Sequence, residues 1–158
     1  MIAEGIFTSK LSYHIAVWGG CGSGMMRSLQ IIQNKMARVV ARVTWTTPTK
    51  EVFNQCGWLS VNQLVMYHSV LLVYKVKASK QPRYLSDMFK GTFMYNTRLA
   101  GSGKIKLEGR PKLELTKNSF KWRAAEQFNQ LPTHIRNSKT LQKFKSNAKA
   151  WIQDNIEF

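Results

Sequence analysis

Apolar residues recur at helical spacing through both ends of the chain. In residues 23–43 they follow the i, i+3, i+4, i+7 rule, which predicts an amphipathic helix with one face in the core and Ser23 as its N-cap. The arginines of this stretch fall on the opposite side at about 100° per residue. The residues expected on the core face are Met25, Met26, Leu29, Ile32, Met36, Val39, Val40 and Val43.

Residues 60–78 predict the central buried helix of the fold. Ser60 and Gln63 have the spacing of a capping box, and the stretch that follows is apolar nearly all round. An amphipathic helix that binds a partner is the alternative, but this stretch has almost no polar side. A core position is therefore the more economical interpretation.

Turn signals mark the ends of the remaining helices. The glycines within residues 19–24 end a first helical stretch, and Thr47-Pro48 and Gly57 bound a short one. Asn118 is the expected cap of the helix that follows it. The further helices that these signals predict cover residues 1–17, 48–56, 83–90, 119–130 and 141–156.

In residues 104–116 apolar and charged residues alternate, and the helical spacing of apolar residues is absent. Ile105 and Leu107 alternate with lysines, and Gly109-Arg110-Pro111 supplies a turn, so a small hairpin or two extended segments with one basic side are expected. The expected fold class is mainly α, a helical bundle of about five to seven helices with this β-hairpin or extended segment. The expected organisation is a helical region at 1–90, a basic linker or hairpin at 91–117 and a C-terminal helical region at 118–158 that packs on the first.

Length and composition indicate a globular chain. The 158 residues correspond to about one domain, and 44% of them are hydrophobic, which is enough for a moderate core. The longest apolar run of the most hydrophobic stretch, Val70–Tyr74, is far shorter than the ~18 residues that span a bilayer, so no transmembrane helix is expected. The first ten residues lack the features of a secretory signal, so the expected location is intracellular, in the nucleus or cytoplasm.

Charge is the first signal that bears on function. The chain has 24 Lys and Arg against 8 Asp and Glu, a net charge of +16, which implies a polyanionic partner. Residues 75–123 hold 13 basic and 3 acidic side chains, whereas residues 59–74 hold no charge at all. A solvated face that only keeps the chain soluble is the alternative, because net charge does not by itself imply a specific contact.

The sequence has no grouping of residues that is typical of a catalytic or metal-binding site. Cys21 and Cys56 are too far apart for a local zinc motif, and the histidines are scattered, so neither a metal nor a cofactor is expected. The glycine stretch at 19–24 lacks the form of a phosphate-binding loop, and no Ser/His/Asp spacing stands out. No catalytic residues and no small-molecule substrate are therefore expected.

Short motifs in a fixed order carry a resemblance to a known family. Leu11-Ser12-Tyr13 is followed by Trp18-Gly19-Gly20, and residues 29–38 have the form LQxxQNxxxR. The later motifs are Trp58-Leu59, Asn62-Gln63, Tyr74-Lys75, Pro82 with Tyr84-Leu85, Thr97-Arg98, Ser119-Phe120, Arg123-Ala124, Asn129 with Leu131-Pro132, Ile135-Arg136, Phe144-Lys145 and Lys149 with Trp151. Over roughly residues 5–152 the chain resembles the C-terminal part of a jockey-like non-LTR retrotransposon polyprotein, just after its reverse transcriptase palm. It departs from that pattern at His14, where glycine is common, and at Phe128, where tryptophan is usual.

The resemblance implies a thumb-like region that holds nucleic acid without catalysing polymerisation. Polymerase chemistry needs closely set aspartates for two metal ions, and the only aspartates here are Asp87 and Asp154. The palm is therefore expected upstream of Met1 in an intact element. Such a module would bind RNA or DNA with tolerance for sequence, and the upstream polymerase domain is a further expected partner. The alternative is a truncated structural or protein-interaction remnant that packed against the missing palm.

Basic residues in two stretches are the candidates for nucleic-acid contact. Positive side chains on a rigid helix can neutralise successive phosphates without reading bases. For each arginine of the helix at 23–43, plain solvation remains the competing interpretation. The candidate residues are Arg27, Lys35, Arg38, Arg42, Lys104, Lys106, Arg110, Lys112, Lys117 and Lys121.

Overall fold

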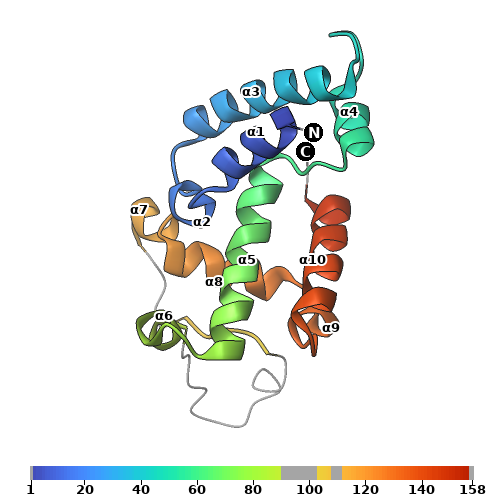
Figure 1. Ribbon diagram of the computed structural model, residues 1–158. Helices are drawn as coiled ribbons and strands as arrows, with labels where there is room; N and C mark the ends of the chain where they lie inside the picture. The colour runs from blue at the N-terminus through green and yellow to red at the C-terminus, as the bar shows by residue number, and fades with distance from the viewer. Residues whose placement is uncertain (1, 90–102, 108–111, 157–158) are drawn as a thin grey trace.

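The computed structural model of the protein describes residues 2–89, 103–107 and 112–156 (Figure 1). These residues are mainly helical and include no strand, so the predicted α class is confirmed. The helices are α1 (Ile2–Ser12), α2 (Ile15–Trp18), α3 (Ser23–Ala41), α4 (Thr49–Cys56), α5 (Val61–Ser79), α6 (Arg83–Met88), α7 (Glu114–Lys117), α8 (Phe120–Gln130), α9 (Thr133–Arg136) and α10 (Leu141–Asn155).

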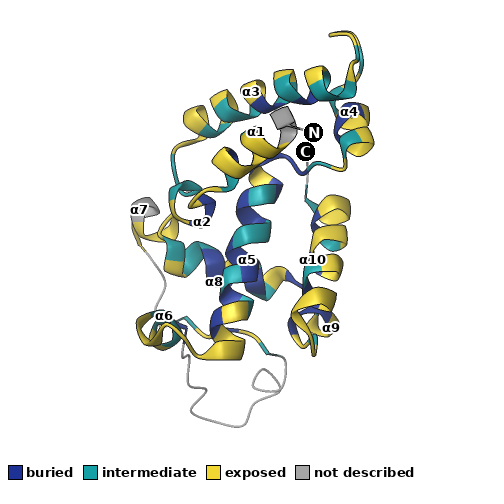
Figure 2. Ribbon diagram, viewed as in Figure 1, coloured by how far each residue is buried: buried dark blue, intermediate teal, exposed yellow. Residues whose placement is uncertain are grey.

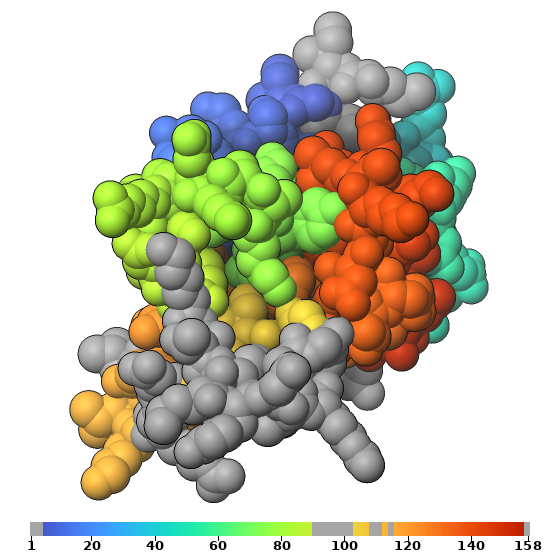
Figure 3. All heavy atoms as spheres, turned by 90° about the horizontal axis from the view of Figure 1, so that it is seen from below, coloured from blue at the N-terminus to red at the C-terminus, as the bar shows by residue number. Residues whose placement is uncertain are grey.

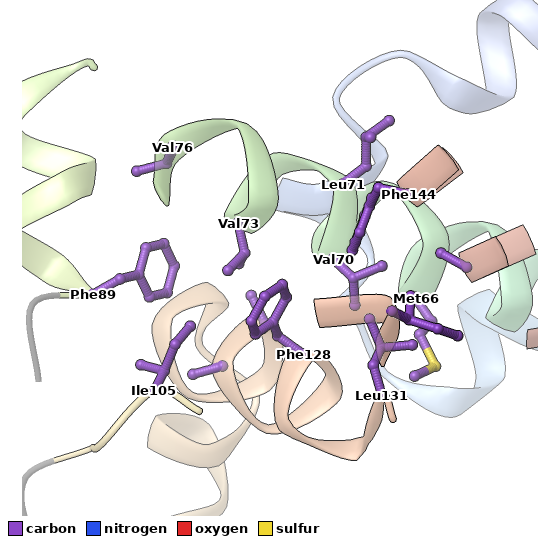
Figure 4. Packing of buried hydrophobic residues seen from close by; sticks show 14 of the residues in the cluster. Met66, Val70, Leu71, Val73, Val76, Phe89, Ile105, Phe128, Leu131 and Phe144 are labelled. Carbon is purple, nitrogen blue, oxygen red and sulfur yellow. The ribbon is translucent and has the colours of Figure 1, made fainter. Parts of the chain in front are cut away.

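Helix α5 is the centre of the fold, as its nearly uniform apolar surface predicts. The Ser60 hydroxyl accepts from the Gln63 backbone N–H, and the Gln63 side chain accepts from the Ser60 N–H, so the predicted capping box is present. Helices α8 and α10 pack on α5. Figure 4 shows Phe128 of α8 among Val70 and Val73 of α5, in the main hydrophobic cluster.

A second, smaller cluster joins α3 to α4. Ala37 of α3 is buried against Val52 and Phe53 of α4, and Trp58 packs at its edge. Figure 1 places α3 and α4 at one end of α5, with α6 at the other end. The fold therefore has two ends that are built from different helices and joined by α5.

The predicted signals around α4 are confirmed. The helix begins directly after Pro48 and ends at Gly57, whose φ of 66° is readily adopted only without a side chain. Helices α4 and α5 meet at a bend of 41°. No single helix of the described segments is both long and apolar enough to cross a membrane, although this bent pair passes that test by length and composition.

Several predicted helix boundaries need correction. The single helix expected at 1–17 is two helices, α1 and α2, because His14 adopts a left-handed conformation with φ of 49° between them. Ser23 is the first residue of α3 and not its cap, which is Gly22. Ser119, not Asn118, is the N-cap of α8, and the short helices α7 and α9 were not expected.

The predicted core face of α3 is wrong for three residues. Met25, Ile32 and Val39 are exposed, whereas Gln33 and Ala37 are buried. The reason is tertiary: the Gln33 side chain donates to the Leu59 carbonyl oxygen at 2.9 Å, which fixes the rotation of α3 about its axis. The apolar arc of α3 is therefore only partly turned toward the core.

The predicted hairpin at 104–116 is also wrong in the residues described. Residues 103–107 are extended beside α8, but the chain at 114–117 forms α7, and residues 108–111 lie outside the described segments. Ile105 is held by the Asn129 side chain, which accepts from its N–H and donates to its carbonyl oxygen, both at 2.8 Å. This side chain occupies the place of a partner strand, and it leaves Lys104 and Lys106 exposed.

Candidate nucleic-acid interface

The candidates on α3 do not all face solvent. Arg27, Lys35 and Arg42 are exposed, as predicted. Arg38 is half-buried, and its guanidinium donates to the Thr47 carbonyl oxygen at 3.2 Å and to the Thr49 hydroxyl at 2.9 Å. Its donors therefore hold the connection between α3 and α4, which makes Arg38 a structural residue in this conformation.

The candidates that follow residue 103 lie on different elements. Lys104 and Lys106 flank the buried Ile105 in the extended segment and point away from the core. Lys112, Lys117 and Lys121 are exposed around α7 and the first turn of α8. Arg110 lies outside the described residues.

The α3 candidates and the two lysines of the 103–107 segment are at opposite ends of α5. At one end, the Gln30 side chain of α3 accepts from the Val61 N–H at 2.8 Å. At the other end, the Lys77 ammonium donates to the Gly103 carbonyl oxygen at 2.7 Å. Val61 and Lys77 are about 24 Å apart along the helix at about 1.5 Å per residue, which exceeds the Debye length of about 10 Å at 0.1 M salt. The α3 residues and the 103–107 segment therefore form two separate surfaces.

Four further basic residues, which are not among the candidates predicted from the sequence, lie where α5 ends. Lys75 and Lys77 lie in its last turns, Lys80 is its C-cap, and Arg83 begins α6. The contact between Lys77 and Gly103 brings the extended segment to the same place (Figure 3). We call the combined group the basic end, and its members are Lys75, Lys77, Lys80, Arg83, Lys104 and Lys106.

Carboxylates are scarce at the basic end. In the described residues of 75–107, Asp87 is the single acidic side chain against six basic ones, which gives 6 − 1 = +5. Arg83 Nε lies 3.9 Å from Asp87 Oδ2, and both side chains are well exposed, so this pair offsets little of the local charge. The basic end is therefore a local excess of positive charge.

The Lys77 ammonium contacts both a ring and a backbone carbonyl within the fold. It lies 4.9 Å from the centre of the Phe128 ring and donates to Gly103. Burial, and then the nearby Arg136 charge, lower the pKa of Lys77. We assign Lys77 to positioning the 103–107 segment against the end of α5.

Other candidate chemistry is sparse in the part of the chain that the structure describes. No three His, Cys, Asp or Glu side chains come together there as a metal site would require. A hollow of about 190 Å³ between the α1–α2 turn and α5 holds His14, His68 and Lys75 in its described lining, without a carboxylate. The orienting acid of a Ser–His–Asp site is not part of that lining.

Comparison with protein-family models, with curated protein sequences and with solved structures gave no match. The geometry of the described residues therefore carries the functional argument.

Proposed function

We propose that this protein binds the backbone of RNA or DNA with little dependence on sequence, through the basic end. The observation that carries the proposal is the contact of the end of α5 with the 103–107 segment, because the described residues of 75–107 hold six basic side chains and one carboxylate. Exposed lysines on a helix end and an adjacent extended segment fit the spaced phosphates of a nucleic-acid strand. Long flexible ammonium groups contact phosphate as point charges and carry no base-edge pattern.

The resemblance to the region after a jockey-like reverse transcriptase palm supports the same proposal. A module beside a polymerase must hold template and primer while any sequence passes, and backbone contact meets that need. Under this proposal the chain is a non-catalytic part of such a polyprotein. The two aspartates of the sequence, Asp87 and Asp154, are far apart in the chain, which supports a binding role over a catalytic one.

Salt dependence of binding tests the proposal. Fluorescence anisotropy with a labelled duplex of about 20 base pairs, and with the matching RNA/DNA hybrid, would be measured at several salt concentrations. We expect log K to fall with log salt with a slope of about −0.9 per phosphate neutralised, so about −3.6 for four contacts on a duplex. Micromolar binding that is insensitive to salt would contradict the proposal.

Two double variants that remove the same charge locate the contact. Lys80→Gln with Lys106→Gln removes two charges from the basic end, and we expect the slope to become shallower by about 1.8. Arg27→Gln with Arg42→Gln removes two charges from α3, and we expect the slope to stay near that of the parent protein. Equal losses in both variants, or a larger loss in the α3 variant, would show that the basic end is not the contact surface.

A second candidate function, docking of another protein, is favoured by a different observation. Of the eleven large apolar side chains that are exposed in the described residues, eight lie within residues 1–45. Figure 2 shows exposed residues along the whole of α3, at the end of the molecule away from α6. This surface is separate from the basic end.

A further inference from the structure

Three exposed apolar side chains on α3 are seven residues apart. Met25 is 62% exposed, Ile32 51% and Val39 67%, although each is of a type that is usually buried. Leu29 and Met36 lie between them in sequence and are half-buried. We call these five residues the α3 strip.

The spacing of the α3 strip is that of a coiled-coil seam. Written in heptad letters, Leu29 and Met36 are a positions, and Met25, Ile32 and Val39 are d positions. The exposed part of the α3 apolar arc is a stripe that fits a single facing helix, because in a coiled coil each a or d side chain enters a hole between four residues of the partner. From Met25 to Val39 the strip is about 21 Å long at about 1.5 Å per residue, the length of a helix of about four turns.

The fold holds the strip outward by polar contacts on the neighbouring face of α3. Gln33 donates to the Leu59 carbonyl oxygen, and the Gln30 side chain accepts from the Val61 N–H. Rotating α3 to bury the strip would break both hydrogen bonds and expose Ala37, which packs on α4. The exposed strip is therefore a fixed surface of this fold.

The positive charge beside the α3 strip indicates what kind of partner binds there. Lys35 is exposed at the g position next to the seam, the exposed Arg42 follows the last residue of α3, and α3 contains no acidic residue. Antiparallel pairing with a second copy would bring these basic side chains close to those of the other copy, and like charges there disfavour association. A phosphate backbone would leave the apolar side chains in water. A helix with an apolar seam and flanking carboxylates satisfies both features.

We infer that α3 docks an amphipathic, acidic helix of a partner polypeptide along Met25, Ile32 and Val39. Carboxylates of that helix lie beside Lys35 and Arg42. The interface is small, so the complex belongs to the weak and transient class. This inference does not depend on nucleic-acid binding at the basic end.

Synthetic helical peptides test the inference with the whole protein. The probe is a peptide of about 18 residues with leucine at a and d and glutamate at e and g, and its control has lysine at e and g. We expect the glutamate peptide to bind with a dissociation constant in the micromolar range and the lysine peptide to bind at least about tenfold more weakly. If neither peptide binds, or if both bind equally, the inference fails.

Two neighbouring isoleucines provide a matched pair of variants. Ile31 and Ile32 have nearly the same exposure, 48% and 51%, but Ile31 lies about 100° around the helix, off the strip. We expect Ile32→Ser to weaken glutamate-peptide binding about tenfold and Ile31→Ser to change it less than about twofold. Equal effects of the two variants would overturn the assigned strip.

Charge reversal tests the proposed orientation. The double variant Lys35→Glu with Arg42→Glu should prefer the lysine peptide over the glutamate peptide, which simple loss of folding cannot produce. Two controls report the other occupants: sedimentation of the protein alone, and binding to vesicles that contain phosphatidylserine. If neither peptide binds and Ile32→Ser abolishes self-association, the α3 strip binds a second copy of the protein. If neither peptide binds and Ile32→Ser abolishes vesicle binding, the strip binds a lipid surface. Either result would show that the inference is wrong.

Discussion

The guanidinium of Arg123 on α8 donates a hydrogen bond to the carbonyl oxygen of Ala16 on α2. Gly20, in the turn after α2, lies against the same guanidinium. This joint connects helices that are 107 residues apart in the chain, and burial at the joint lowers the pKa of Arg123. Two of the motifs that carry the family resemblance, Trp18-Gly19-Gly20 and Arg123-Ala124, thus meet in the fold.

Gly20→Ala should destabilise the protein by about 1–3 kcal/mol, because a β-carbon there has no room. The β-carbon would lie 2.5 Å from the Asn118 carbonyl oxygen and against the Arg123 side chain. The carbonyl oxygen belongs to the backbone, so moving it away would cost energy. Gly24→Ala is the control, since a β-carbon at that helical position meets nothing within 4 Å. We expect Gly24→Ala to raise stability by about 0.5–1 kcal/mol in urea unfolding. If both alanine variants lose similar unfolding free energy, the close packing of Gly20 against Asn118 and Arg123 is not the cause of the loss.

Arg136→Met should cost about 3 kcal/mol of unfolding free energy. The buried guanidinium of Arg136 donates to the carbonyl oxygens of Asn129 and Leu131 and to the Thr133 hydroxyl. Methionine fills a similar volume but leaves these acceptors without that donor, and buried acceptors without partners are costly. Urea unfolding measures the change.

The control for Arg136→Met is Lys139→Met, three residues later in the same region. Lys139 is exposed, so its replacement removes the same charge without removing buried hydrogen bonds, and we expect a change within about 0.5 kcal/mol. If the two variants lose equal stability, the loss comes from charge and not from the hydrogen bonds of Arg136.

Local signals in the sequence predicted the elements that are governed by local chemistry. The capping box at Ser60 and the Pro48 and Gly57 boundaries appear in the structure because their hydrogen bonds and dihedral angles involve neighbours in the chain. The rotation of α3 about its axis, which decides which of its side chains are buried, could not be predicted from such local signals. Its apolar arc is wide, and the part that faces the core is chosen by Gln33 and Leu59, which are 26 residues apart.

The sequence predicted part of the basic end, for the same reason. The alternation around Ile105 predicted that Lys104 and Lys106 point outward, and they do. The placement of their segment depends on the hydrogen bond that Asn129 of α8 accepts from the Ile105 N–H and on the one that Lys77 of α5 donates to Gly103, each spanning more than twenty residues. No local pattern reports such contacts, so Lys75 and Lys80 were not selected from the sequence.

Arg38→Met and Arg42→Gly should have opposite effects on stability. Arg38 holds Thr47 and Thr49, so its loss should destabilise the protein by about 1–2 kcal/mol. Arg42 ends α3 with a φ of 55°, a conformation that glycine adopts at lower cost, so Arg42→Gly should stabilise by about 0.5–1 kcal/mol. Thermal unfolding of the two variants, which carry the same net charge, measures the difference. A destabilised Arg42→Gly variant would mean that the Arg42 side chain has a structural role of its own.

Protonation of His68 should destabilise the fold as pH falls. Burial, and then the charge of Lys75, lower the pKa of His68 below its ordinary value of 6.5. The unfolded chain therefore takes up a proton at a higher pH than the folded protein does. Stability from neutral His68 is fully present above pH 6.5 and is lost as pH falls toward the folded pKa.

Urea unfolding at pH 7.5, 6.0 and 5.0 measures this loss, with the His68→Gln variant beside the parent protein. Glutamine does not titrate, so His68→Gln should lose less stability than the parent over this range. Lys75→Gln is an intermediate case, because it removes the repelling charge but leaves His68 half-buried. The expected order of pH sensitivity is parent, then Lys75→Gln, then His68→Gln. An unchanged pH dependence in His68→Gln would assign the acid sensitivity to other groups of this highly basic chain.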